Sequence, residues 1–391
     1  MVENPSSSAV SRREFLRRVT ALGGAAALAA AIQACSVRGI ETQVLNSATG
    51  VPGSPASVLE IAPTTKVTPS ATATAGEATP SPTPTVTPDD GTARVAFVKT
   101  NNRAEGVRQA IALLGINPVL GKSVFLKPNF NSSDPAPGST HPDVLTSLVT
   151  TLKEMGASNI AVGDRSGMGN TRQVMEQLGI FQLSNELGFD VTVFDELTAE
   201  EWVLIQPAAG HWQNGFWFAR PCFEADALVQ TCCLKTHQYG GHFTLSLKNS
   251  VGMAAQRYPG ENYDYMQELH SSSHQRRMIA EINTAYTPAL VLLDGVEAFK
   301  SGGPHAGGRV TPEVILAGTD RIAIDAAGVA LLRYFGCQTE AARGKIFEQE
   351  QIARAVELGL GVDRPEKIEF LTGDADSKDY SEIIKEVLTA G

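Results

Sequence analysis

Apolar residues fall into two alternating patterns beyond residue 91 of this 391-residue chain. Short continuous apolar runs are typical of strands buried on both faces, and segments with an apolar residue every three or four positions are typical of helices packed on one side. The runs predict strands at residues 94–99, 123–127, 159–163, 191–194, 227–233, 289–293, 313–317 and 367–371. The periodic segments predict helices at residues 102–114, 142–156, 171–178, 184–187, 276–286, 321–335, 347–358 and 381–388. This order predicts an α/β domain over residues 92–391 with a mostly parallel β-sheet flanked by helices, although the aromatic-rich residues 202–218 show no clear period and favour an irregular or β insertion.

The start of the chain has a different character. Residues 11–17, SRREFLR, match the twin-arginine export pattern, and an apolar stretch follows at residues 19–34. This stretch is short for a membrane span, which needs about 20 residues, and it runs into Cys35 through the IQAC sequence of a lipoprotein cleavage box. We therefore expect residues 1–34 to be a signal peptide handled by the twin-arginine export machinery, and Cys35 to carry a lipid. An uncleaved anchor and a soluble exported protein are the alternatives.

Residues 35–91 are rich in Thr, Pro and Ser and lack apolar periodicity. Such a segment cannot bury enough apolar surface to offset the entropy lost on ordering, so we expect a disordered stalk. A diacylated Cys35 at its start would anchor the protein in the membrane, because two acyl chains hold where one binds only weakly. The predicted location is the outer face of the cytoplasmic membrane.

The charge of the chain limits its partners. The formal net charge is −10 at pH 7, which is not the balance of a nucleic-acid-binding protein, and we expect no nucleic-acid partner. An anionic ligand would therefore have to be attracted by local clusters of basic residues rather than by the overall field.

Polar residues follow the predicted strands at the point where each strand ends. Five of these residues are Lys127, Asp164, Lys235, Asp294 and Asp320. Parallel strands end at one edge of a sheet, where open α/β sheets bind ligands, so we expect all five to converge on one cleft. The richest stretch, residues 234–252, holds two lysines and two histidines, and we expect it to lie outside the core because buried charge without partners is costly.

Roles can be assigned from side-chain chemistry. Lysines offer compact positive charge to a phosphate or carboxylate, and His237 is the best acid/base candidate, ahead of His242, because its ordinary pKa lies near neutrality. The predicted catalytic residues are His237, Lys235, Lys127 and Asp164. The predicted ligand-binding residues are Asn129, Arg165, Ser166, Gly167, Lys248 and Asn249.

A cofactor is left open. Carboxylate oxygens at strand ends suit a divalent metal, so Asp294 and Asp320 are metal-ligand candidates, with helix capping as the alternative for Asp320. Cys222, Cys232, Cys233 and Cys337 are too few and wrongly spaced for a structural zinc site, and they do not form the closely spaced run of a ferredoxin-type iron–sulfur cluster. The pair in the predicted strand favours buried small residues, although a disulfide to Cys222 is open.

Seven short motifs occur in a characteristic order. They are LKPN at residues 126–129, THP at 140–142, GDRSG at 163–167, LKTH at 234–237, SLKNSVG at 246–252, DG at 294–295 and DRIAID at 320–325. In order and spacing they resemble the domain of unknown function 362 family, from Arg94 to about Gly361. The resemblance implies an exported or cytoplasmic α/β protein of undefined biochemistry, often joined to iron–sulfur modules; no run of closely spaced cysteines of the ferredoxin type occurs here, so we expect no cluster.

Two classes of function fit these observations. The first is an enzyme that acts on a small anionic substrate by acid/base chemistry, with or without a divalent metal. The second is a membrane-tethered binding protein that captures an anionic ligand without changing it. The many polar groups of both signs favour the enzyme.

Overall fold

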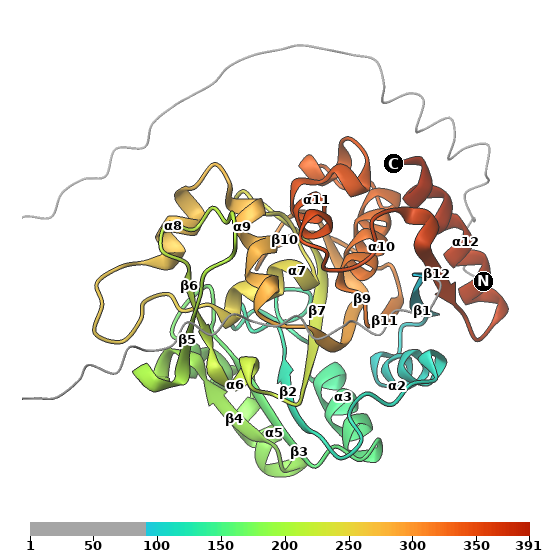
Figure 1. The fold of residues 1–391 in the computed structure, drawn as a ribbon. Coiled ribbons are helices and arrows are strands. Elements are labelled where there is room, and N and C mark those ends of the chain that lie inside the picture. The colour runs from blue at the N-terminus through green and yellow to red at the C-terminus, as the bar shows by residue number, and fades with distance from the viewer. Residues whose placement is uncertain (1–90) are drawn as a thin grey trace, which may run out of the picture. The chain divides into compact units, whose positions relative to one another are not determined.

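The computed structural model describes residues 91–391, which form a ten-stranded sheet covered by helices (Figure 1). The predicted signal peptide, Cys35 and the predicted stalk up to residue 90 lie outside the described residues. In order across the sheet the strands are β12 (Ile368–Leu371), β1 (Ala93–Lys99), β11 (Val314–Gly318), β9 (Pro288–Gly302), β7 (Ala227–His237), β2 (Ser123–Lys127), β3 (Asn159–Asp164) and β4 (Asp190–Val193), with β8 (His242–Thr244) beside β7 and β10 (Gly307–Val310) beside β9.

One strand of the main path runs against the others. The pairs β12–β1, β9–β7, β7–β2, β2–β3 and β3–β4 are parallel, whereas β11 is antiparallel to both β1 and β9. The short strands β8 and β10 fold back on their neighbours as hairpins. The predicted α/β fold with a mostly parallel sheet is confirmed, and β11 ends at the edge opposite to the other long strands.

Helices cover both faces of the sheet. They are α2 (Arg103–Leu114), α3 (Pro142–Glu154), α4 (Thr171–Gln177), α5 (Ile180–Leu187), α6 (Arg220–Phe223), α7 (Ser246–Asn249), α8 (Tyr265–Ser271), α9 (Gln275–Ile282), α10 (Arg321–Tyr334), α11 (Glu350–Glu357) and α12 (Ala375–Ala390). Strand β1 shows the two faces through its alternation: Val95 and Phe97 join the core around α10, whereas Ala96 and Val98 join the core under α2 and α3. A strand that is apolar on both faces needs this three-layer arrangement.

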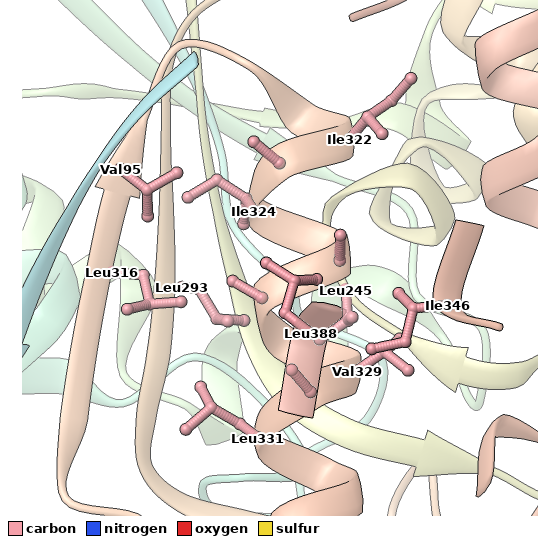
Figure 2. Packing of buried hydrophobic residues seen from close by; sticks show 14 of the residues in the cluster. Val95, Leu245, Leu293, Leu316, Ile322, Ile324, Val329, Leu331, Ile346 and Leu388 are labelled. Atoms are coloured by element: carbon pink, nitrogen blue, oxygen red, sulfur yellow. The ribbon is translucent and has the colours of Figure 1, made fainter. Parts of the chain in front are cut away.

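Helix α10 is the centre of the first of these cores. Its residues from Arg321 to Leu332 are all buried, and Figure 2 shows Leu245, Leu293 and Leu388 gathered around it from three other parts of the chain. Burying a large aliphatic side chain contributes roughly 1.5–3 kcal/mol. Because Leu245 directly precedes α7, this core also fixes the start of the short helix that carries Lys248.

The aromatic segment that had no clear period forms a small separate sheet. Strands β5 (Trp202–Ile205) and β6 (Phe216–Ala219) pair antiparallel, and their aromatic side chains join a third core with α8 and α9. Within residues 91–391 no helix is long and apolar enough to span a membrane.

The difference from the predicted elements that bears on the site lies in β7, although β9 also runs further than predicted, to Gly302. The strand continues beyond residue 233 to His237 because the returning strand β8 pairs Lys235 with Thr244 and His237 with His242. The expectation that residues 234–252 lie outside the core is therefore wrong: Lys235 is fully buried, and Lys248 is 8% exposed. The cysteines in β7 are buried as predicted, and the four cysteines of residues 91–391 form no disulfide.

Candidate functional site

A cavity of about 760 Å³ lies where β2, β3 and β7 end, between their turns and the segments around α7 and α8. It is the place that open α/β sheets offer to a ligand. The predicted site residues that line it are Lys127, Asn129, Asp164, Arg165, Gly167, Lys235, His237, Lys248 and Asn249. Nine of the predicted residues are thus brought together in one place.

Lys127 and Asp164 form a buried ion pair on the cavity floor. The Lys127 Nζ lies 2.7 Å from the Asp164 Oδ1, and it also donates to the Asn249 Oδ1 at 3.0 Å. Asp164 accepts two backbone N–H bonds, from Phe130 and Arg165, each at 2.7 Å. A Cβ at Gly252 would lie 2.2 Å from the Asp164 Oδ1, so the chain can close over the pair only with glycine there. Burial lowers the pKa of Lys127 and the carboxylate opposes that shift, which makes the pair a fixed, compensated unit.

Lys235 has neutral partners instead of a carboxylate. Its Nζ donates to the Asn129 Oδ1 at 2.8 Å and to the carbonyl of Gly138. Burial of the fully enclosed ammonium lowers the pKa of Lys235 to about 8. The side chain therefore exchanges its proton near physiological pH.

Within residues 91–391 Lys248 has neither a carboxylate partner, as Lys127 does, nor neutral hydrogen-bond acceptors, as Lys235 does. Among residues 91–391 no carboxylate, carbonyl or amide forms an ion pair or hydrogen bond with its Nζ, although the side chain is only 8% exposed. The pKa of Lys248 is lowered to about 8. Burial is the largest cause, and the charges of Lys235 and Arg165 add to it. A Cβ at Gly241 would lie 2.6 Å from the Lys248 Cε, so this glycine allows the hairpin turn to lie directly on the lysine stem.

His237 is held as a neutral ring. Its Nδ1 accepts the backbone N–H of Tyr239 at 3.2 Å, which leaves the single ring proton on Nε2. Burial first, and then the charges of Lys248 and Lys235, keep the pKa of His237 far below its usual range. The tautomer makes Nε2 a hydrogen-bond donor, and the lowered pKa does not favour the predicted acid/base role, which stays a prediction. The second candidate, His242, lies in β8 and does not line the cavity.

The cavity holds more positive charge than negative. Asp164 is paired with Lys127, and Asp264 is paired with Arg257 at 2.7 Å. Arg165 donates to the carbonyls of Ala254 and Val251 and has no ion pair within the described residues. The charges of Arg165, Lys235 and Lys248 are thus left without an ion-paired carboxylate, an arrangement that favours an anionic ligand.

Comparison with known proteins places this cavity in a family. Residues 124–330 match the family described as "Domain of unknown function (DUF362)", and the match covers more than half of the 391 residues. The chain belongs to the DUF362 family. The matched segment runs from β2 into α10, so the cavity residues named so far all lie within the DUF362 region.

Two individual proteins are similar to this DUF362 chain. The "Thylakoid-associated protein sll1697" of Synechocystis sp. is 25% identical over 210 residues, which cover 52% of this chain and 61% of that protein. The chain thus spans less than two thirds of the length of this relative. A structure of the lactate racemase apoprotein from Thermoanaerobacterium thermosaccharolyticum is 14% identical, covers 75% of this chain and 86% of that chain, and has a TM-score of 0.35. The likeness at that TM-score supports no conclusion about function.

Three predicted residues do not reach the cavity of this DUF362 domain. Asp294 lies in the middle of β9, where it forms an ion pair with the Arg103 Nε at 2.9 Å. Asp320 caps α10 by accepting the Ala323 N–H at 2.9 Å, and it lies at the opposite edge because β11 runs antiparallel. Ser166 donates its hydroxyl to the Phe130 carbonyl at 2.7 Å.

The predicted convergence of five strand-end residues is therefore wrong for the two aspartates. Each aspartate has its own partners on a different part of the sheet, so the pair does not form a metal site. Within residues 91–391 no three or more His, Cys, Asp or Glu side chains are grouped closely enough to hold a metal ion.

The cavity also contains residues that the sequence reasoning missed. They include Asn131, Met168, Tyr239, Thr244, Met266 and His270. The Asn131 Nδ2 and the Thr244 Oγ1 are buried without a hydrogen-bond partner, which is uncommon for buried polar atoms. Asn131 follows the LKPN motif by two residues and could have been suspected, whereas α8 carries no motif that points to the site.

Proposed function

We propose that the DUF362 cavity is an active site in which a small anionic substrate undergoes acid/base chemistry. The observation that carries this proposal is the cavity itself, in which Arg165, Lys235 and Lys248 lie buried without an ion-paired carboxylate within residues 91–391; burial also lowers the pKa of each of the two lysines to about 8. A site that only captures an anion is best served by lysines that stay charged. Lysines that gain and lose a proton near pH 8 are suited to proton transfer, because catalysis is most efficient when the pKa lies near the working pH.

The surrounding residues have supporting roles in this proposal. Asn129 fixes the Lys235 ammonium through its Oδ1, and the Nε2–H of His237 offers a hydrogen bond to a substrate oxygen. The Lys127–Asp164 pair connects β2 and β3 and, through Asn249, the helix that carries Lys248. The excess positive charge attracts the anion.

Turnover by the purified full-length chain tests this proposal. Small carboxylates and phosphate esters that raise the melting temperature would first be identified, and each would then be followed by NMR between pH 6 and 9. The matched variant is Lys235→Arg, because arginine keeps the charge but does not give up its proton. We expect turnover to fall by about 100-fold or more with binding largely retained.

Lys345 provides the control, since its side chain is 76% exposed and lies outside the cavity. Lys345→Arg should leave turnover unchanged. If anions bind to the wild-type protein and none is converted at any pH, the cavity belongs to a binding protein and the enzyme proposal is wrong.

We also propose that the protein works outside the cytoplasm. The support is the sequence alone: the twin-arginine pattern at residues 11–17 and the cleavage box that ends at Cys35. Replacing Arg12 and Arg13 by lysine should retain the chain in the cytoplasm, and Cys35→Ser should remove incorporation of labelled fatty acid and release the protein from the membrane fraction. Unchanged labelling of the Cys35→Ser variant would contradict lipidation at that residue.

A further inference from the structure

The three buried lysines of the cavity differ in what they contact. Lys127 is paired with a carboxylate, and Lys235 donates to an amide oxygen and a carbonyl oxygen. Among the described residues Lys248 has no such partner. A buried ammonium without a partner is far more costly than a neutral amine with its free lone pair. Lys248 is thus the lysine of the cavity whose nitrogen is free to act as a nucleophile.

The backbone that carries Lys248 is rigidly held. The buried carboxylate of Asp325 accepts the backbone N–H groups of Ser246 at 2.8 Å and Leu247 at 3.1 Å, together with the Ser246 hydroxyl at 2.6 Å. Asn283 donates to the Leu247 carbonyl at 3.0 Å. These bonds fix α7, and the turn at Gly241 lies on the lysine stem, so the amine is directed and does not move freely.

We propose that Lys248 forms an imine with an aldehyde or ketone group of the anionic substrate, an inference that rests on the proposed function of the cavity. A desolvated lysine beside other cations is a recognised arrangement for carbonyl chemistry, because the neutral amine is the attacking form. The Nε2–H of His237 is placed in the same cavity to donate to the carbonyl oxygen.

The step balances without a further reactant. The lone pair of Lys248 attacks the carbonyl carbon, and one proton moves from the nitrogen to the oxygen to give a carbinolamine. The Lys235 ammonium supplies a second proton, and the oxygen leaves as water. The product is a protonated imine on Lys248 and a neutral amine on Lys235. One positive charge has moved from Lys235 to Lys248, so the total charge of the cavity is unchanged.

The charged and titratable groups around Lys248 agree with this role. Lys248 shares the cavity with Lys127, Asp164, Arg165, Lys235, His237, Tyr239, Asp264 and His270, and helix α10, which packs against α7, adds the Asp325 carboxylate and Arg321 on the side of the α7 backbone. Cations therefore outnumber carboxylates. The resulting pKa of about 8 means that imine formation should increase as the pH rises from 6 to 8.

Reductive trapping on the full-length chain tests the inference. The protein is incubated at pH 8 with glyoxylate, a small carboxylate that carries an aldehyde, and with cyanoborohydride, which reduces the imine to a stable amine. Peptide mass spectrometry then measures the label at each lysine. We expect Lys248 to be labelled about tenfold or more faster than the exposed Lys345, because a larger fraction of Lys248 is unprotonated at that pH.

Two controls separate specific imine formation from random labelling. Glycolate has the charge of glyoxylate but lacks the aldehyde, so an excess of it should protect Lys248 and leave Lys345 unaffected. Lys248→Arg should remove the specific label while its melting curve reports that the variant is folded. The measurement on the wild-type protein does not depend on any variant.

The outcomes distinguish this inference from the proposed function. If glycolate stabilises the protein and Lys248 is labelled no faster than Lys345, the imine is wrong and the anion site stands. If Lys248 is not labelled and neither glycolate nor inorganic phosphate stabilises the protein, both the imine and the anion site are wrong.

Discussion

Two regions of the sheet carry polar residues directly after apolar strands, and the residues of only one of them line the cavity described above. At the ends of β2, β3 and β7, the lysine region, three buried lysines lie together, and Lys248 has no partner within the described residues. Around β9 and β11, the aspartate region, Asp294 is paired with Arg103, and Asp320 accepts two backbone N–H groups, from Ala323 and Val362. The comparison teaches that polar residues after apolar strands mark a candidate site only where the strands end at the same edge and the charges are left without paired carboxylates.

The cost of breaking the Lys127–Asp164 pair gives the strongest test of the lysine region. Lys127→Met leaves a buried carboxylate without its counter-ion, so we expect the free energy of unfolding to fall by about 3–5 kcal/mol. Urea unfolding of the full-length chain measures it. The matched control is the half-exposed pair of Arg172 and Glu196, where Arg172→Met should cost about 0–1 kcal/mol. Equal losses in the two variants would contradict the buried, compensated pair.

Removing the unpaired charge of Lys248 should raise the free energy of unfolding, in contrast to the loss of Lys127. The pKa of Lys248 is lowered from 10.5 to about 8, so below pH 8 the folded state carries the buried charge at a cost, and Lys248→Met should be more stable than the wild type there by about 1–3 kcal/mol. Between pH 8 and 10.5 the unfolded wild type binds more protons than the folded one, so its stability rises with pH and the gap closes. Unfolding by urea at pH 7, 8, 9 and 10 measures the gap, and a gap that widens with pH contradicts the assignment.

The aspartate region should respond in stability alone. Asp320→Ala removes the acceptor of the Ala323 and Val362 N–H groups, so we expect a loss of about 1–2 kcal/mol in the free energy of unfolding. Binding of glycolate, measured by calorimetry, should not change, because Asp320 does not line the cavity. If the folded Asp320→Ala variant lost glycolate binding, Asp320 would contribute to the anion site and the separation of the two regions would be wrong.

The smallest effect distinguishes the two possible roles of His237. A neutral ring that donates from Nε2 can be replaced in part by the amide of glutamine, so we expect His237→Gln to retain more glycolate affinity than His237→Phe, which should lose about tenfold. Because the pKa of His237 lies far below its usual range, wild-type affinity should show no histidine titration between pH 6 and 7. A titration there would restore the acid/base role.

Most of the elements and part of the cavity could be predicted because both depend on local patterns. The runs and periods of apolar residues indicate strands and helices directly, and nine predicted residues line the cavity since β2, β3 and β7 are parallel. The errors have non-local causes. Asp320 was misplaced because β11 is antiparallel, and the extension of β7 was missed because it depends on pairing with β8.

The sequence by itself determined the element types, the motif order of the DUF362 family and the set of polar residues that follow the strands. The tertiary structure decided which of those residues meet, which are paired and which are left with a lowered pKa. The physical reason is distance along the chain: Asn249 reaches Lys127 across 122 positions, and Arg103 reaches Asp294 across 191. Periodicity within a segment carries no information about such contacts, whereas the direction of one strand and the partner of one buried charge depend entirely on them.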